Sequence, residues 1–200
     1  MAVAKPLLTY LDKAEISYEI VPHKKVYTAY DLAQTLGEKL DGIAKTLLVK
    51  VELPKVDKRG KHYILVIPAS YRANFAKIKK ALKAKKVEMA VEKTLKKLKL
   101  NPGAITPFGG YHKLEILVDK ALLKTKHALV SAGAHTEALR VKVKDLHEKE
   151  GATLGQFGDK AKIQLQKFMK KAAGNGVKKA AKKVVKAFGK AKKVLKKKKA

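Results

Sequence analysis

The sequence predicts a compact mixed α/β (α+β) domain over about residues 1–150, followed by a basic segment that stands apart from it. Short apolar and β-branched runs typical of strands alternate with segments in which apolar residues recur every three or four positions. Glycine and proline turns separate these runs. A chain of 200 residues is also long enough for one domain with a substantial core and an appendage. We therefore expect five or six strands interleaved with short helices, in a compact mixed-sheet domain.

Helices are predicted where helical spacing of apolar residues follows a suitable first residue. Pro6 suits a first helical turn, Thr28 with Asp31 resembles a capping box, and Asn74 is a candidate N-cap. Gly37 has the conformational freedom needed just after a helix end. The helices are expected over residues 5–14, 29–36, 75–82 and 91–100.

Strands are predicted where apolar residues alternate or form short continuous runs. The turn-rich segment 54–60 lies between two such runs, so residues 44–53 and 62–68 are expected to pair as an antiparallel hairpin. Pro22 is expected to stop the first strand, and Asp119 to cap a helical turn near Leu122. The strands are expected over residues 17–21, 44–53, 62–68, 114–118, 128–130 and 139–143, and residues 85–90 are expected to be extended.

The chain carries 47 Lys and Arg against 17 Asp and Glu, a formal net charge of +30. Residues 151–158 are small and are expected to form a linker. Residues 159–200, the C-terminal tail, hold 17 lysines and one acid, Asp159. Alanine and valine recur in the tail at helical steps, but its lysines repel one another, so we expect a basic helix that is frayed or disordered when alone. Such a charge attracts polyanions, with nucleic acid the leading partner and an anionic membrane surface the second.

The composition also excludes several classes of function. The absence of cysteine removes disulfides, thiolate nucleophiles and cysteine-bound zinc. The six histidines lack tight ligand spacing, and Ser17, Ser70 and Ser131 lie in no Gly-x-Ser-x-Gly frame, so neither a metal site nor a serine hydrolase is predicted. The N-terminus lacks a signal-peptide core and no apolar run could span a membrane. A soluble, cytoplasmic protein without a cofactor or metal is expected.

Three stretches are candidates for chemistry. In Ala44-Lys-Thr-Leu-Leu-Val49, Lys45 lies at the entrance of a core strand, where its ammonium group can be aimed at an anion or a carbonyl. A lysine that merely extends from the strand edge to solvent is the alternative. The segment 103–110 is dense in glycine and proline and can offer backbone amides to a ligand. The third stretch is Ser131-Ala-Gly133.

In their order and separations these stretches resemble the YbaK/prolyl-tRNA synthetase insertion-domain family, over about residues 5–148. The resemblance implies an aminoacyl-tRNA deacylase, a trans-editing hydrolase that cleaves the ester of mischarged tRNA. It implies that Lys45 is essential for catalysis and that the loop from Gly103 to Pro107 shapes the pocket. The residues expected to bind substrate are His23, Tyr27, Thr28, Gly103, Thr106, Pro107, Phe108, Gly109, Ser131 and Gly133.

Physical chemistry agrees with this assignment. The substrate is an ester flanked by phosphate, so a lysine can anchor the phosphate while loop amides polarise the carbonyl, as in an oxyanion hole. The family's usual mechanism uses a water helped by the ribose hydroxyl of the substrate. An aminoacyl-tRNA synthetase is a further candidate partner.

Two sets of lysines are expected to contact nucleic acid backbone, which positions a ligand without specifying its sequence. They are Lys79, Lys80 and Lys83 in the body, and Lys178, Lys179, Lys182, Lys183 and Lys186 in the tail. The body lysines could instead be an ordinary solvated helix face. In composition alone, the tail is similar to those of linker-histone-like and nucleoid proteins, which leaves a non-catalytic DNA- or RNA-binding protein as the alternative function.

Overall fold

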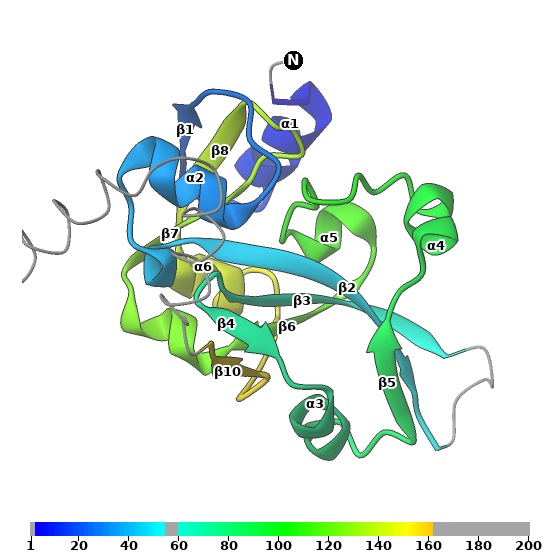
Figure 1. The fold of residues 1–200 in the computed structure, drawn as a ribbon. Helices are drawn as coiled ribbons and strands as arrows, with labels where there is room; N and C mark the ends of the chain where they lie inside the picture. The colour runs from blue at the N-terminus through cyan, green and yellow to red at the C-terminus, as the bar shows by residue number, and fades with distance from the viewer. Residues whose placement is uncertain (1–2, 55–59, 162–200) are drawn as a thin grey trace, which may run out of the picture. The chain divides into compact units, whose positions relative to one another are not determined.

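The computed structural model describes residues 3–54 and 60–161 (Figure 1). These residues form one compact unit that extends to Ala161. The lysines predicted in the tail beyond residue 161 lie outside the described residues.

The described residues form three β-sheets, of five, three and two strands. The five-stranded sheet is mixed, because β2 is antiparallel to both β5 and β3 whereas β6 is parallel to β3 and β9. In sheet order it contains β5 (Lys86–Met89), β2 (Ala44–Glu52), β3 (Lys61–Pro68), β6 (Glu115–Asp119) and β9 (Thr153–Gly155). The antiparallel three-stranded sheet contains β1 (Tyr18–Pro22), β8 (Glu137–Lys142) and β7 (His127–Ser131). The pair consists of β10 (Gly158–Lys160) and β4 (Tyr71–Ala73).

Short helices connect and cover these sheets. The α-helices are α1 (Lys5–Lys13), α2 (Ala29–Leu36), α3 (Phe75–Ala81), α4 (Glu92–Lys97), α5 (Gly109–His112) and α6 (Val143–Glu148), and the 3-10 helices are η1 (Leu40–Gly42) and η2 (Lys120–Lys124). The predicted caps are confirmed: the Thr28 side chain accepts from the Asp31 N–H, and the Asn74 side chain accepts from the Lys77 N–H. Gly37 ends α2 in the left-handed region, with φ of 68°.

The two faces of β2 enter different parts of the core, because successive side chains on a strand point to opposite faces. Ala44 and Leu48 belong to a cluster with the three-stranded sheet, α1 and α6. Val49 and Val51 belong to a second cluster with Ile78 of α3 and Phe157. Figure 1 shows α1, β1 and β8 on one side of β2, and α3, β4 and β10 on the other.

Residues 151–158, predicted to be a linker, belong to the folded body instead. β9 pairs with β6, β10 pairs with β4, and Phe157 is fully buried. The buried carboxylate of Asp119 fastens this segment, because one of its oxygens accepts hydrogen bonds of 2.7 Å from the N–H groups of both Phe157 and Gly158. The prediction failed because small residues also suit close packing: a Cβ on Gly155 would lie 2.4 Å from the Phe157 ring.

Several short elements also differ from the prediction. Gly109 and Gly110 begin α5 rather than end a loop, and a Cβ on Gly109 would lie 2.3 Å from the Leu114 carbonyl oxygen. The first strand includes Pro22, whereas β4 and α6 carried no clear sequence signal. The elements β4, α5 and α6 have only three, four and six residues, which is too short for periodicity to reveal.

Candidate functional site

A pocket of about 320 Å³ lies along one edge of β2. We call it the β2 pocket; its lining comes from residues 23–32, 43–48, 89–105 and 131–138. It lies between the part of β2 that pairs with β5, Val49 to Glu52, and Ile43, which forms a parallel bridge with Leu129 of β7. Four segments far apart in the sequence meet at this part of the strand.

The free edge of β2 presents backbone polar groups to this pocket. The Leu48 carbonyl accepts a 3.0 Å hydrogen bond from the N–H of Ala90, after which the chain leaves the edge. Alternate residues of a strand direct their backbone groups to the same edge, so the N–H and carbonyl of Thr46 face the same way as those of Leu48. At Thr46, no strand among the described residues continues the β5 side of the sheet.

Thr46 also has an unusual side chain. Its Oγ1 atom is buried, and within residues 3–54 and 60–161 it has no hydrogen-bond partner. A buried hydroxyl group without a partner costs about 1–3 kcal/mol. Thr46 lines the β2 pocket, so a ligand that enters the pocket lies beside this residue.

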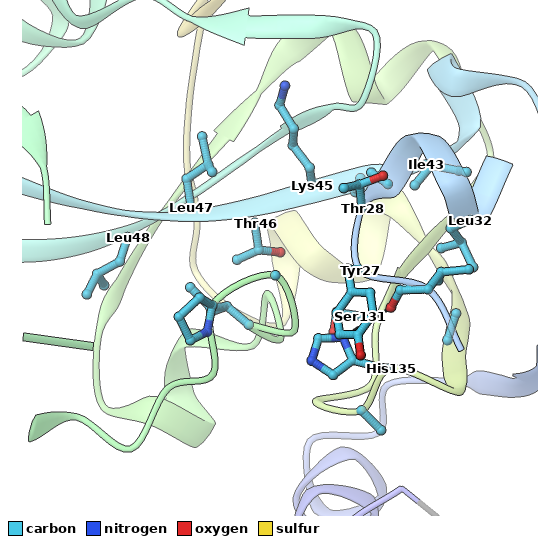
Figure 2. A pocket seen from close by; sticks show the side chains of 18 of the residues that line it. Tyr27, Thr28, Leu32, Ile43, Lys45, Thr46, Leu47, Leu48, Ser131 and His135 are labelled. Carbon is cyan, nitrogen blue, oxygen red and sulfur yellow. Dashed lines mark hydrogen bonds between the residues drawn. The ribbon is translucent and has the colours of Figure 1, made fainter. Parts of the chain in front are cut away.

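Lys45, the predicted catalytic residue, lines the same pocket, but its ammonium group has a partner elsewhere. The Nζ atom donates a hydrogen bond to the carbonyl of Tyr71 in β4. Figure 2 shows the Lys45 side chain leaving β2 on the side opposite Thr46. Burial, and secondarily the positive charge of Arg72, lowers the pKa of Lys45.

Aromatic and hydroxyl groups from the loop before α2 and from the end of β7 and the loop after it lie near Thr46 in the pocket (Figure 2). The Tyr27 and His135 rings lie 4.9 Å apart, and His135 Nδ1 is 3.1 Å from the Val26 carbonyl oxygen, which fixes the imidazole. The Ser131 hydroxyl accepts a 3.2 Å hydrogen bond from the Gly133 N–H, so its own hydrogen can still be donated. Neither Thr46 nor His135 was singled out from the sequence. A small polar residue inside an apolar strand was a usable signal for Thr46, whereas His135 carried none.

The glycine-proline loop reaches the pocket through its first part. Pro102, Gly103 and Ile105 line it, and Gly103 has φ of +79° with Tyr27 so close that a Cβ would lie 2.9 Å from the Tyr27 carbonyl oxygen. Only glycine fits there without strain. The loop therefore packs directly against the segment that carries Tyr27.

The other predicted substrate-binding residues divide between the pocket and its surroundings. His23 and Thr28 line the β2 pocket, although the Thr28 hydroxyl is engaged with Asp31 in the cap of α2. Thr106, Pro107, Phe108 and Gly109 are buried, and Phe108 is a core residue with no exposed surface. These four and Gly133 do not line the β2 pocket, although Thr106 and Gly133 line an adjoining cavity.

The predicted nucleic-acid-binding lysines of the body, Lys79, Lys80 and Lys83, are exposed on or just after α3. They are not among the residues that line the β2 pocket. In the part of the chain that the structure describes, no three His, Asp or Glu side chains are grouped so that they could hold a metal ion. No described helix is both long and apolar enough to cross a membrane.

Comparison with protein families places this fold among known proteins. Residues 23–149 match the model of a family described as aminoacyl-tRNA editing domain. The prolyl-tRNA editing protein ProX of Acetoanaerobium sticklandii is 25% identical over 154 residues, which cover 74% of this chain and 90% of the relative.

Solved structures agree on the fold. A putative trans-editing enzyme for prolyl tRNA synthetase superposes with a TM-score of 0.67 at 18% identity, covering 80% of this chain and 98% of the other. A hypothetical protein superposes with a TM-score of 0.68 at 22% identity, covering 78% of this chain and 100% of the other. The fold is thus that of free-standing chains of similar length to the folded body.

Proposed function

The chain belongs to the aminoacyl-tRNA editing domain family, and from this premise we propose that its β2 pocket hydrolyses the ester of mischarged tRNA. Membership makes the chain an aminoacyl-tRNA deacylase with tRNA as its substrate. One observation supports the location: β2, with Lys45 and Thr46, and the Gly103 loop line one pocket although they are distant in the sequence.

The reaction needs a polarised carbonyl and a stabilised oxyanion. Water attacks the ester carbonyl carbon, a tetrahedral intermediate forms, and the bond to the ribose oxygen breaks as that oxygen takes up a proton. In our proposal the ester carbonyl accepts a hydrogen bond from the partnerless Thr46 hydroxyl, and the backbone N–H groups of Thr46 and the Gly103 loop add to this. Donors already in position stabilise the oxyanion most, because they need no rearrangement during the reaction.

Lys45 contributes charge in this proposal. The Lys45 ammonium leaves the Tyr71 carbonyl and swings around the edge of β2. It then bonds to the oxyanion that develops on the substrate. A charged oxygen is a stronger partner for an ammonium group than a neutral carbonyl. The flexible four-carbon stem of lysine permits such a movement on the time scale of side-chain rotation.

The substrate class can be narrowed further. The names of the relatives make a tRNA for proline the first candidate. The pocket is lined by apolar side chains such as Leu32, Ile43 and Leu48, which favours an uncharged amino acid.

The basic tail is proposed to raise affinity for tRNA, with other RNA or DNA as further ligands and an aminoacyl-tRNA synthetase as a further partner. The 16 lysines from residue 162 onward support a nonspecific phosphate-binding role. Lys79, Lys80 and Lys83 are proposed to contact the tRNA backbone in the same manner.

The test is a deacylation assay of the full-length protein against a panel of misacylated tRNAs, with a truncated form that ends at residue 161 beside it. We expect both forms to hydrolyse the ester, and the truncated form to show a higher KM with a kcat within about twofold. If neither form deacylates any member of the panel, the proposed function is wrong. Equal KM values for the two forms would dismiss the role of the tail.

A further inference from the structure

A second cavity, of about 470 Å³, adjoins the β2 pocket. We call it the His112 pocket; it is lined mainly by residues 99–106, 111–112 and 132–136, with Lys25 at its edge. The two pockets share Ile105, Ala134 and His135. The two pockets therefore adjoin each other at these three residues.

Rings and hydrogen-bonding groups line the His112 pocket. His112 Nε2 is 2.7 Å from the Thr106 hydroxyl, and the Tyr111 and His112 rings lie 4.9 Å apart. Burial lowers the pKa of His112, which favours the neutral imidazole. With the side-chain amide of Asn101 nearby in the lining, the cavity offers π-surfaces and neutral hydrogen-bonding groups, which suit a nucleobase.

The rim of the His112 pocket is positively charged. Lys25 and Lys99 both line it and both are exposed. Lys25 Nζ lies 5.4 Å from the centre of the Tyr27 ring, at the boundary with the β2 pocket. Within residues 3–54 and 60–161 neither lysine forms an ion pair with a carboxylate, so both charges are available to an anion.

We propose that the His112 pocket binds the 3′-terminal nucleotide of the tRNA, with its base against His112 and Tyr111 and its phosphate between Lys25 and Lys99. The ribose would then lie over His135 and direct the ester into the β2 pocket. This inference rests on the proposed function, because an ester on the terminal ribose must enter the β2 pocket with its base and phosphate still attached.

The test uses adenosine 5′-monophosphate as the probe, with the full-length protein. The variants are Lys25→Gln, Lys99→Gln and the double variant, and the matched control is Lys97→Gln, which changes an exposed lysine of α4 outside the pocket. We expect the probe to inhibit deacylation competitively, and the double variant to raise both its inhibition constant and the KM for tRNA about tenfold, with kcat changed less than about twofold. The slope of log KM against log salt should fall by about 0.7 for each lysine removed.

The outcomes separate this inference from the proposed function. Binding of the probe is also measured directly by NMR on a Thr46→Val variant, which leaves the His112 pocket intact. If the protein deacylates but the double variant and Lys97→Gln bind the probe alike, the nucleotide site is overturned and the deacylase stands. If the probe binds through Lys25 and Lys99 but no ester is hydrolysed, the nucleotide site stands and the proposed reaction is overturned. Equal inhibition by adenosine without phosphate would also overturn the role of the two lysines.

Discussion

Lys45 and Thr46 are neighbours on β2, yet the structure treats them in opposite ways. The Lys45 ammonium has a partner, the Tyr71 carbonyl, on one side of the strand. The buried Thr46 hydroxyl lies on the other side and has no partner within the described residues. The Lys45 ammonium is thus hydrogen-bonded in the free protein, whereas the Thr46 hydroxyl has no hydrogen bond within the described residues. A substrate has to displace a bond at Lys45 but only has to form one at Thr46.

The largest expected effect tests the charged side of this comparison. Lys45→Ala should lower kcat for deacylation by about two to three orders of magnitude, because charge stabilisation of an oxyanion is worth roughly that much. The fold should persist, since only one side chain at the strand entrance is lost. Lys45→Met keeps the stem without the charge and should be equally inactive. Normal turnover by either variant, measured at saturating tRNA, would remove Lys45 from the mechanism.

Thr46→Val tests the role of the Thr46 hydroxyl and should have a smaller effect on the deacylation rate than the Lys45 variants. The variant keeps the shape but removes the hydroxyl, so deacylation should slow about tenfold, the cost of one hydrogen bond made in the transition state. Stability should be unchanged or higher by about 1 kcal/mol, because the free protein loses a polar group that had no partner. Urea unfolding and kcat together check this, with Thr46→Ser as the control that retains the hydroxyl. A destabilised variant with a normal rate would mean that the hydroxyl serves the fold alone.

The pH dependence of stability should report the burial of His112. Burial lowers the folded-state pKa of His112 below its ordinary value of about 6.5. Between these two pKa values the unfolded chain binds more protons, so stability should fall as pH drops below about 6.5. His112→Gln should reduce this loss, and exposed His127→Gln should not, in urea unfolding at pH 7.5 and 5.5. If His112→Gln lost stability at low pH as much as the unmodified protein does, other groups would be responsible for that loss.

The smallest expected effect concerns the charge next to Lys45. Arg72 is the second cause of the lowered Lys45 pKa, after burial. Arg72→Gln should therefore raise that pKa and move the alkaline limb of the rate profile to higher pH, because the ammonium form is the active one. At neutral pH the rate should stay within about twofold. Arg140→Gln serves as a control. If the alkaline limb of the pH–rate profile does not move in Arg72→Gln, Lys45 is not the group whose ionisation causes that limb.

Local signals in the sequence predicted much of the fold. The caps of α2 and α3, and the β2–β3 hairpin, were predicted because a cap or a turn depends on residues only a few positions apart. The family match confirms the resemblance predicted from three stretches of sequence. β9 and β10 were missed because their partners, β6 and β4, are distant in the chain and three residues hold too little pattern.

The site was predicted less completely than the fold. Lys45 and Gly103 both line the β2 pocket, but the Lys45 ammonium bonds to Tyr71, and alternation along a strand cannot say which face receives a ligand. Thr46 was missed because a lysine suggests chemistry more strongly than a threonine, although only coordinates reveal which of the two already has a partner. Phe108 was assigned to the substrate from its place in a loop, and packing in the core was not visible in that pattern.

The central claim is that an aminoacyl ester enters the β2 pocket beside Thr46 and draws Lys45 from Tyr71. A crystal structure with an adenosine whose 3′ position carries an amide-linked amino acid, which resists hydrolysis, tests this most directly. We predict that the carbonyl of the analogue lies within hydrogen-bond distance of Thr46 Oγ1 and that Lys45 Nζ no longer contacts the Tyr71 carbonyl. An analogue bound elsewhere, with Thr46 Oγ1 without a partner and Lys45 still on Tyr71, would contradict the claim.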